Sequence, residues 1–267
     1  MISNALIASF TASGLFACLA PVALMLFVRR TLRTDWRWFA VGAAAFTVSQ
    51  LLTRIPMIAV LGSVLKKQLE QPAVQWVWIA ALCISAGLFE ETARYLCFRY
   101  LMKDAREWKN AIALGVGHGG IEAVTIVGLS AFSSVITILL INSGHFPTSL
   151  LPADQPETLQ KITETFLKLH GWEPLLGIWE RGVALTFHIA ASCLVLQRFL
   201  RGQSRWYWYA VALHAVTNGV AVVTMRMWGA VQAEAVLTVF WVISGWIIAR
   251  TRPREGERSP VVLERMG

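Results

Sequence analysis

The sequence predicts an all-α membrane protein, a polytopic bundle of about seven transmembrane helices. Of its residues, 56% are hydrophobic and only 15% are charged, and the mean hydropathy is +0.55, which is far too apolar for an ordinary soluble domain. The apolar residues form long stretches, each sufficient to cross a hydrocarbon core that requires roughly 20 residues per helix. Basic residues gather in every second connection between these stretches, as they do in proteins with several membrane spans.

The apolar stretches define the expected spans, which lie near residues 4–28, 36–62, 74–102, 110–142, 174–198, 206–225 and 230–250. The first begins without a basic residue and runs for about 25 residues, unlike a cleavable signal peptide, so we expect it to be retained. The fourth is too long for one straight crossing. Its glycines offer places to bend or break, which would create an eighth element; they are Gly115, Gly117, Gly119, Gly120 and Gly128. We expect residues 1–250 to form a single domain, followed by a basic cytoplasmic tail at 251–267.

Basic residues are divided unequally between the two sides of the predicted bundle. One side carries fifteen: Arg29, Arg30, Arg33, Arg37, Lys103, Arg106, Lys109, Arg198, Arg201, Arg205, Arg250, Arg252, Arg254, Arg258 and Arg265. The other carries five: Lys66, Lys67, Lys161, Lys168 and Arg226. Under the positive-inside rule, this asymmetry predicts an N-terminus outside and a C-terminus in the cytoplasm, and we expect the protein in the inner membrane of a bacterial cell. Contact with anionic lipid headgroups explains the net charge of +8 better than nucleic acid does.

The long connection at 143–173 contains ETLQKITETFLKL (157–169), in which apolar residues recur at helical spacing. This pattern predicts a short amphipathic helix on the outer face of the membrane. The cysteines are Cys18, Cys83, Cys97 and Cys193. They fall inside predicted spans and form no C-x-x-C pair, so we expect neither a disulfide framework nor a zinc knuckle.

Charged residues lie at membrane depth in several spans: Arg54, Arg94, Arg99, Arg181, Glu90, Glu91, Glu122 and Glu180. Each costs about 2.5–3.5 kcal/mol even on the mildest insertion scale, so such charges should be paired or functional. A group nearer the outer side consists of Arg54, Glu180, Arg181 and Glu234. We expect this group to form interhelical ion pairs. Arg99 lies near the interface and should extend toward water.

The other polar residues form one layer across four predicted helices. Counted from the cytoplasmic ends, the layer lies about 12–18 Å deep and contains Glu90, His118, His188, His214 and Asn218. Polar residues also recur four positions apart, in the pairs Glu90 and Arg94, His118 and Glu122, His188 and Ser192, and His214 and Asn218. Each pair shares one helix face. We expect the four faces to converge on a water-containing cavity in the cytoplasmic half of the membrane.

The glutamate doublet indicates acid and base chemistry. Adjacent carboxylates in a low-dielectric site resist simultaneous ionisation, and Arg94 can hold one of them ionised. The pair can then take a proton from water and return it to a leaving group. Histidines on facing helices can position that water, and the Asn218 amide can donate to a developing oxyanion. Hydrolysis of a peptide bond fits this set of residues.

Four motifs in the chain resemble the YhfC family of intramembrane proteases: EETAR (90–94), GHGGIEA (117–123), ERGVALTFHIAAS (180–192) and HAVTN (214–218). That family is similar to the wider group of CAAX prenyl endopeptidases and bacteriocin-processing enzymes. The resemblance implies an intramembrane endopeptidase whose paired glutamates, Glu90 and Glu91, activate water. It assigns Arg94 to the doublet, and His214 with Asn218 to the final H-x-x-x-N motif.

His118 and His188 both fit the middle histidine of this pattern. The arginine follows the doublet after two residues instead of the three of the CAAX pattern, so we do not transfer the CAAX substrate preference. We expect a protein or peptide substrate, lipidated or embedded in the membrane, and contact with membrane lipids.

Alternatives stay open from the sequence. His118, His188 and His214 with one carboxylate could bind a catalytic zinc ion, although we favour a metal-free glutamate mechanism. Histidines on facing helices could instead hold b-type haem. Intramembrane Glu, His and Arg residues could also relay protons in a transporter.

Overall fold

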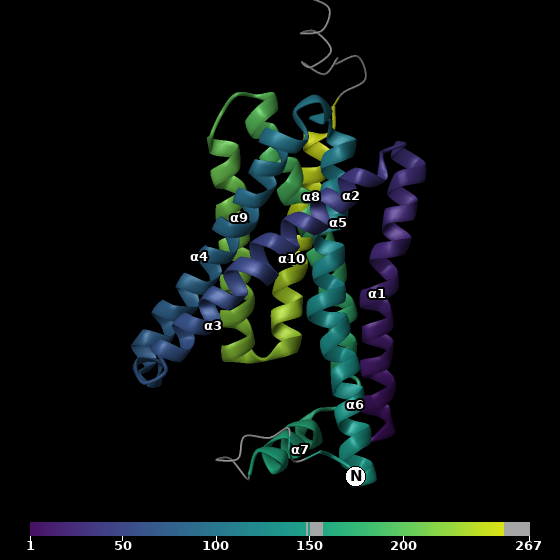
Figure 1. The fold of residues 1–267 in the computed structure, drawn as a ribbon, viewed down its shortest axis with the longest axis vertical. Helices are drawn as coiled ribbons and strands as arrows, with labels where there is room; N and C mark the ends of the chain where they lie inside the picture. The colour runs from purple at the N-terminus through teal and green to yellow at the C-terminus, as the bar shows by residue number, and fades with distance from the viewer. Residues whose placement is uncertain (148, 150–156, 254–267) are drawn as a thin grey trace, which may run out of the picture. The chain divides into compact units, whose positions relative to one another are not determined.

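The computed structural model describes residues 1–147, 149 and 157–253. Every regular element in these residues is a helix (Figure 1). Seven helices among them are long and apolar enough to span a membrane: Asn4–Leu32, Trp36–Val64, Pro72–Leu101, Trp108–Ser143, Glu173–Leu200, Arg205–Trp228 and Ala230–Thr251. Each lies within a few residues of its predicted span. The prediction of a multi-pass, all-α membrane protein with seven spans is confirmed.

Segments of π-helix interrupt three of the spans. The second span consists of α2 (Trp36–Phe46), η1 (Thr47–Arg54) and α3 (Ile55–Val64). The third consists of α4 (Pro72–Leu96) and η3 (Cys97–Leu101), and the fourth of α5 (Trp108–Glu122), η5 (Ala123–Gly128) and α6 (Leu129–Ser143). The remaining α-helices are α1 (Asn4–Leu32), α7 (Thr158–Lys168), α8 (Leu176–Leu200), α9 (Arg205–Trp228) and α10 (Ala230–Thr251). Segments of π-helix inside α-helices often accompany functional sites.

Local sequence signals explain several helix ends. The Asp35 side chain accepts a hydrogen bond from the Arg37 backbone N–H at 2.9 Å and so caps the start of α2. Pro72 opens α4, where its missing N–H costs nothing. Gly144 and Gly229 adopt φ values of 74° and 96°, which favour glycine, and they follow the ends of α6 and α9.

The expected break among the first glycines of the fourth span does not occur. α5 continues as an α-helix through them, and the π segment begins only at Ala123. Gly115 and Gly117 instead permit close helix packing. A Cβ on Gly117 would overlap the Phe39 carbonyl oxygen of α2, and one on Gly115 would lie 2.5 Å from Ile189 Cα of α8. Small residues are common where membrane helices approach this closely.

The chain falls into two compact units. The smaller consists of Met1–Ala20 and Ala123–Arg181, and the larger of Pro21–Glu122 and Gly182–Gly267. The expectation of a single domain over residues 1–250 stays a prediction. Most of the basic tail lies outside the described residues, so the prediction for residues 251–267 also stays open.

The smaller unit has its own apolar cluster, formed around Ile2, Leu6 and Ile138. The Asn142 amide bonds both the N–H and the C=O of Ile2, at 2.8 Å each. The predicted amphipathic helix is present in this unit as α7. Its Phe166 ring meets the Phe10 ring edge-on at 6.1 Å, whereas its place at the membrane surface stays a prediction.

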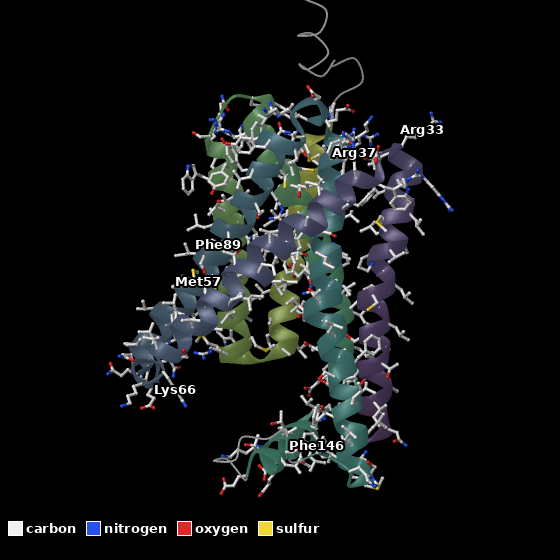
Figure 2. All side chains as sticks on the ribbon, in the orientation of Figure 1. Arg33, Arg37, Met57, Lys66, Phe89 and Phe146 are labelled. Carbon is white, nitrogen blue, oxygen red and sulfur yellow. The ribbon has the colours of Figure 1, made fainter. Side chains whose placement is uncertain are left out.

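The larger unit contains the main core and, as shown below, all the predicted site residues. In it α2 packs on α5, α4 on α9, and α9 on α10 (Figure 1). Its buried core includes Phe39, Phe98, Leu114 and Leu196. The four cysteines of the chain are free thiols. Figure 2 shows Arg33 and Arg37 at one end of this unit and Lys66 at the other, which agrees with connections alternating between two sides of a membrane.

Candidate functional site

The site is assembled from four helices of the larger unit. α4 supplies Glu90, Glu91 and Arg94, α5 supplies His118 and Glu122, α8 supplies His188, and α9 supplies His214 and Asn218. Glycines bring these helices together. A Cβ on Gly87 would lie 2.8 Å from the Val211 carbonyl oxygen of α9, and one on Gly119 would lie 2.9 Å from the His188 ring. Because these positions lack a Cβ, the polar side chains can meet across the interfaces.

Glu91 is held by two partners in the interior of the site. Its Oε1 atom accepts a hydrogen bond from Arg94 Nη1 at 2.5 Å and one from His214 Nδ1 at 2.8 Å. Glu91 and Arg94 are both fully buried. Since a carboxylate only accepts, His214 Nδ1 carries a proton, and its Nε2 is left facing Glu90, 3.6 Å from Oε1.

Glu90 stands at the meeting point of the histidines. His118 Nε2 lies 2.9 Å from Glu90 Oε2, His214 Nε2 lies 3.6 Å from Glu90 Oε1 and His188 Nδ1 lies 3.8 Å from Glu90 Oε2. The nearest guanidinium nitrogen of Arg94 is 3.7 Å away. Three helices other than its own therefore bring an imidazole to this one carboxylate.

His188 is fixed by partners on both ring nitrogens. Arg94 Nη2 lies 2.7 Å from Nδ1, and because a guanidinium only donates, Nδ1 is the acceptor. The proton is then on Nε2, which lies 2.6 Å from Glu122 Oε2. Arg94 thus links the glutamate doublet to the histidine of α8, and Glu122 fixes the far side of that ring.

Aromatic rings enclose the histidines. The Phe46 ring meets the His118 ring edge-on with centroids 5.3 Å apart. The Phe187 ring meets both His188 and His214, at 5.4 and 5.0 Å. Sequence reasoning missed these two phenylalanines. Phe187 precedes a predicted site histidine, but phenylalanine is so common in membrane spans that its position carries little signal.

Seven predicted residues meet in this cluster: Glu90, Glu91, Arg94, His118, Glu122, His188 and His214. Asn218 follows His214 by one helical turn, is half-buried, and makes no side-chain hydrogen bond to another described residue. Its role stays a prediction. Ser192 is not part of the cluster, because its hydroxyl donates to the His188 carbonyl oxygen of its own helix.

The outer group agrees with its expected ion pairs in one respect and differs in another, and the expectation for Glu234 stays a prediction. Arg54 donates to three neutral acceptors on two helices and forms no interhelical ion pair with another described residue, so that expectation is wrong. Glu180 and Arg181 do pair, at 2.6 Å, but they are neighbours on one helix. Arg99 donates to the Tyr95 hydroxyl at 2.8 Å and is exposed.

The cluster offers ligands suited to a metal ion. One ligand atom from each of Glu90, His118 and His188 lies within 4.8 Å of the others, and all three residues are buried. This carboxylate and imidazole set matches zinc in ligand type. His118 Nδ1 is buried without a hydrogen-bond partner, so this ring has a nitrogen to spare. Both His188 nitrogens have partners, so metal binding there would displace Arg94 or Glu122.

His214, which the sequence placed in the metal trio, is not in this group. Its Nδ1–H nevertheless donates to the Glu91 carboxylate, an arrangement that often supports a metal-bound histidine through the other nitrogen.

The described residues hold seven apolar spans, four of which supply buried carboxylates, histidines and an arginine to one cluster, and together they define a multi-pass membrane protein with an acid–histidine centre. The chain belongs to the YhfC intramembrane metalloprotease family, whose model matches residues 16–241. It is 34% identical over 256 residues to the uncharacterized membrane protein YhfC of Bacillus subtilis (strain 168), covering 91% of this chain and 97% of that protein. No solved structure matches the chain. The resemblance inferred from the four motifs is confirmed for this family, whereas the link to the CAAX group stays a prediction.

Proposed function

We propose that this protein is an intramembrane endopeptidase in which the Glu90 carboxylate activates the water that hydrolyses a peptide bond. The observation that carries the proposal is the contact of Glu90 with imidazoles from three other helices, at 2.9 to 3.8 Å. The family name supports membrane proteolysis in general. The substrate is a protein or peptide, lipidated or embedded in the membrane, and the membrane is the inner membrane of a bacterium.

The surroundings of the two glutamates favour Glu90 as the general base. Glu91 is fully buried, and its Oε1 accepts from Arg94 and His214. Its Oε2 has no hydrogen-bond partner, but the two donors on Oε1 stabilise the ionised carboxylate and so make it a weaker base. Glu90 has one short contact, with His118, and looser ones with the other imidazoles. A carboxylate with a free lone pair beside positioned rings is what general base catalysis requires.

The proposed reaction is a water addition followed by loss of the amine. Glu90 takes a proton as the water oxygen attacks the carbonyl carbon, and the carbonyl π electrons move to its oxygen. Asn218, half-buried beside His214, donates to that oxyanion. When the C–N bond breaks, Glu90 returns the proton to the leaving nitrogen. His214 Nε2 accepts a hydrogen bond from the attacking water, since Nδ1 is committed to Glu91.

The metal-assisted version of the same function would give Glu90 another role, as a metal ligand. A zinc ion would be held by Glu90, His118 and His188, and when bound it would polarise the carbonyl and acidify the water. Whichever of Arg94 and Glu122 is not displaced would then orient His188, and Glu91 would still hold His214. We favour the metal-free version because both nitrogens of His188 already bond other side chains.

The test uses purified protein in proteoliposomes, supplied with membrane proteins extracted from bacterial cells, with new peptide termini identified by mass spectrometry. Glu90→Gln should abolish the new termini. Glu107→Gln, which alters an exposed ion pair with Lys109, should leave them unchanged. Termini that persist at full yield in Glu90→Gln would remove Glu90 from the proposal. Activity that survives a strong chelator at zero bound metal rules out zinc, and activity lost and restored by Zn²⁺ selects the metal version.

The geometry is less suited to the haem alternative, whereas the transport alternative is decided by experiment. The His118 and His188 ring centroids are 5.1 Å apart, which leaves no space for a porphyrin between them, and each of the three rings already contacts a carboxylate. A Soret band in the purified protein would favour haem. Solute accumulation in proteoliposomes that survives Glu90→Gln and Glu91→Gln would favour transport.

A further inference from the structure

Arg54 of η1 is a buried cation whose described hydrogen-bond partners are all neutral, although the Glu90 carboxylate acts on it electrostatically from beyond ion-pairing distance. Its Nε donates to Ser85 Oγ at 3.1 Å, Nη1 to Gln50 Oε1 at 3.0 Å, and Nη2 to the Leu82 carbonyl oxygen at 2.6 Å. Only 9% of its surface is exposed, and no described carboxylate lies within ion-pairing distance. A charge buried in this way is expensive unless an ion of opposite sign can reach it.

Gln50, one turn before Arg54, adds an unused donor. Because a guanidinium only donates, Gln50 must present its amide oxygen to Arg54, and its Nε2 faces elsewhere. Gln50 is 3% exposed, and its Nε2 has no hydrogen-bond partner. The guanidinium has five N–H groups and its three bonds use three of them. Arg54 and Gln50 can therefore donate further hydrogen bonds to a ligand. The guanidinium has no acceptor, and the Gln50 amide oxygen is already used by Arg54.

These donors lie near the candidate site. Phe46, which immediately precedes η1, packs against the His118 ring that bonds Glu90. On α4, the Arg54 acceptors Leu82 and Ser85 precede Glu90 by eight and five residues, or about 12 and 7.5 Å of helix rise. An extended peptide covers that distance in about two to four residues.

We propose that Arg54 and Gln50 form a substrate subsite that binds a carboxylate. The ligand is a carboxylate of a peptide chain, from its C-terminus or from an acidic side chain. Its position two to four residues from the cleaved bond rests on the proposed function of Glu90, whereas carboxylate binding itself does not. A lipid phosphate is excluded as the ligand, because Arg54 lies ten residues inside the nearer end of its span, about 15 Å along the helix.

The test measures binding, without cleavage, to the full chain in nanodiscs of neutral phosphatidylcholine. The probes are three versions of one fluorescent hydrophobic hexapeptide: a C-terminal free acid, a C-terminal amide, and an amide with one internal glutamate. Fluorescence anisotropy should show one carboxylate version binding roughly 10- to 100-fold tighter than the plain amide, as expected for hydrogen bonds to a charged group. Whichever version is preferred identifies the source of the carboxylate.

Two variants make the test decisive. Arg54→Gln removes the charge, and Gln50→Glu places a carboxylate of the protein beside Arg54. Both should abolish the preference while leaving the affinity for the plain amide unchanged. Gln50→Glu gives the buried cation an ion partner, so it should unfold at no lower temperature than the natural protein, and its loss of preference will not reflect misfolding.

Equal binding of the three probes to the natural protein would overturn the proposal, as would a preference that persists in Gln50→Glu. The outcome is separate from that of the proteolysis test. Glu90→Gln should lose cleavage but keep the carboxylate preference, so a protein that binds the probes selectively and cleaves nothing would refute the proposed function and leave the subsite standing.

Discussion

Glu90 and Glu91 are consecutive residues whose side chains have different tasks because they leave α4 about 100° apart. Glu91 points to Arg94 and His214 and bonds both at 2.5 to 2.8 Å. Glu90 points to the layer where the histidines of α5, α8 and α9 meet. The buried guanidinium of Arg94 therefore depends mainly on Glu91, and the proposed water chemistry depends on Glu90.

This difference predicts unequal stabilities for two isosteric variants. Glu91→Gln should lower the free energy of unfolding by about 3–5 kcal/mol, because it leaves the Arg94 charge buried without its closest counter-ion. Glu90→Gln should cost clearly less, since Arg94 Nη2 is 3.7 Å from Glu90 and keeps its bond to Glu91. Tryptophan fluorescence during thermal and denaturant unfolding in detergent measures both.

Glu107→Gln is the matched control, because Glu107 and Lys109 form an exposed pair of the kind that contributes about 0–1 kcal/mol. If Glu90→Gln destabilises the protein as much as Glu91→Gln does, the division of tasks between the two carboxylates is wrong.

At the level of elements, hydrophobic length predicted where the spans begin and end, but not which helices touch. Each helix must satisfy its own backbone inside a bilayer, so span boundaries follow from local composition. Helix pairing depends on surfaces that come from distant residues. The glycines of α5 illustrate this limit. From the sequence, Gly115 and Gly117 suggest a bend in the helix, whereas in the structure they allow Ile189 and Phe39 of neighbouring helices to pack closely.

Arg54 illustrates the same limit for charges. The sequence shows that a cation lies at membrane depth and that glutamates exist elsewhere, so an ion pair was the simplest expectation. The acceptors it actually uses include the Leu82 carbonyl oxygen and Gln50, and a backbone carbonyl carries no signal in the sequence. The helical spacing of the site residues was more informative, because residues four apart share a face whatever the neighbouring helix is.

The packing of α2 on α5 predicts a strong effect of one methyl group. Gly117→Ala would place a Cβ against the Phe39 carbonyl oxygen. This oxygen belongs to the helix backbone, so it cannot move aside as a flexible side chain could. The two helices should separate, displacing His118 of α5 from Glu90. Overpacking of this kind costs typically 1–3 kcal/mol, and proteolytic activity should fall together with stability.

Gly219→Ala on α9 is the matched control for this prediction, because nothing lies within 4 Å of the Cβ that it adds. Thermal unfolding and the peptide-terminus assay, run on both variants, provide the comparison. Gly117→Ala with unchanged stability and activity would show that the α2–α5 contact tolerates a shift and does not position the site.

For the whole molecule, the sequence predicted that the polar layer would be shared by four spans, and the side chains of those spans do meet in one unit of the chain. It could not assign the individual bonds, such as Arg94 to His188, because these depend on how far each helix is rotated about its axis. The orientation of the chain in the membrane also stays a prediction, since it depends on the surrounding membrane and on the basic connections.

The charge asymmetry predicts that Lys67 faces the outside and Lys109 the cytoplasm. The measurement is cysteine labelling in intact cells, with Lys67→Cys or Lys109→Cys introduced into a chain whose four native cysteines are replaced by alanine. A reagent that cannot cross the membrane should label the cysteine at 67 at once and the one at 109 only after the cells are opened. The reverse pattern would place the glutamate and histidine site in the outer half of the membrane. A substrate would then have to reach Glu90 from the outside. The basic residues of the α1–α2 connection would also lie outside the cell, contrary to the positive-inside rule.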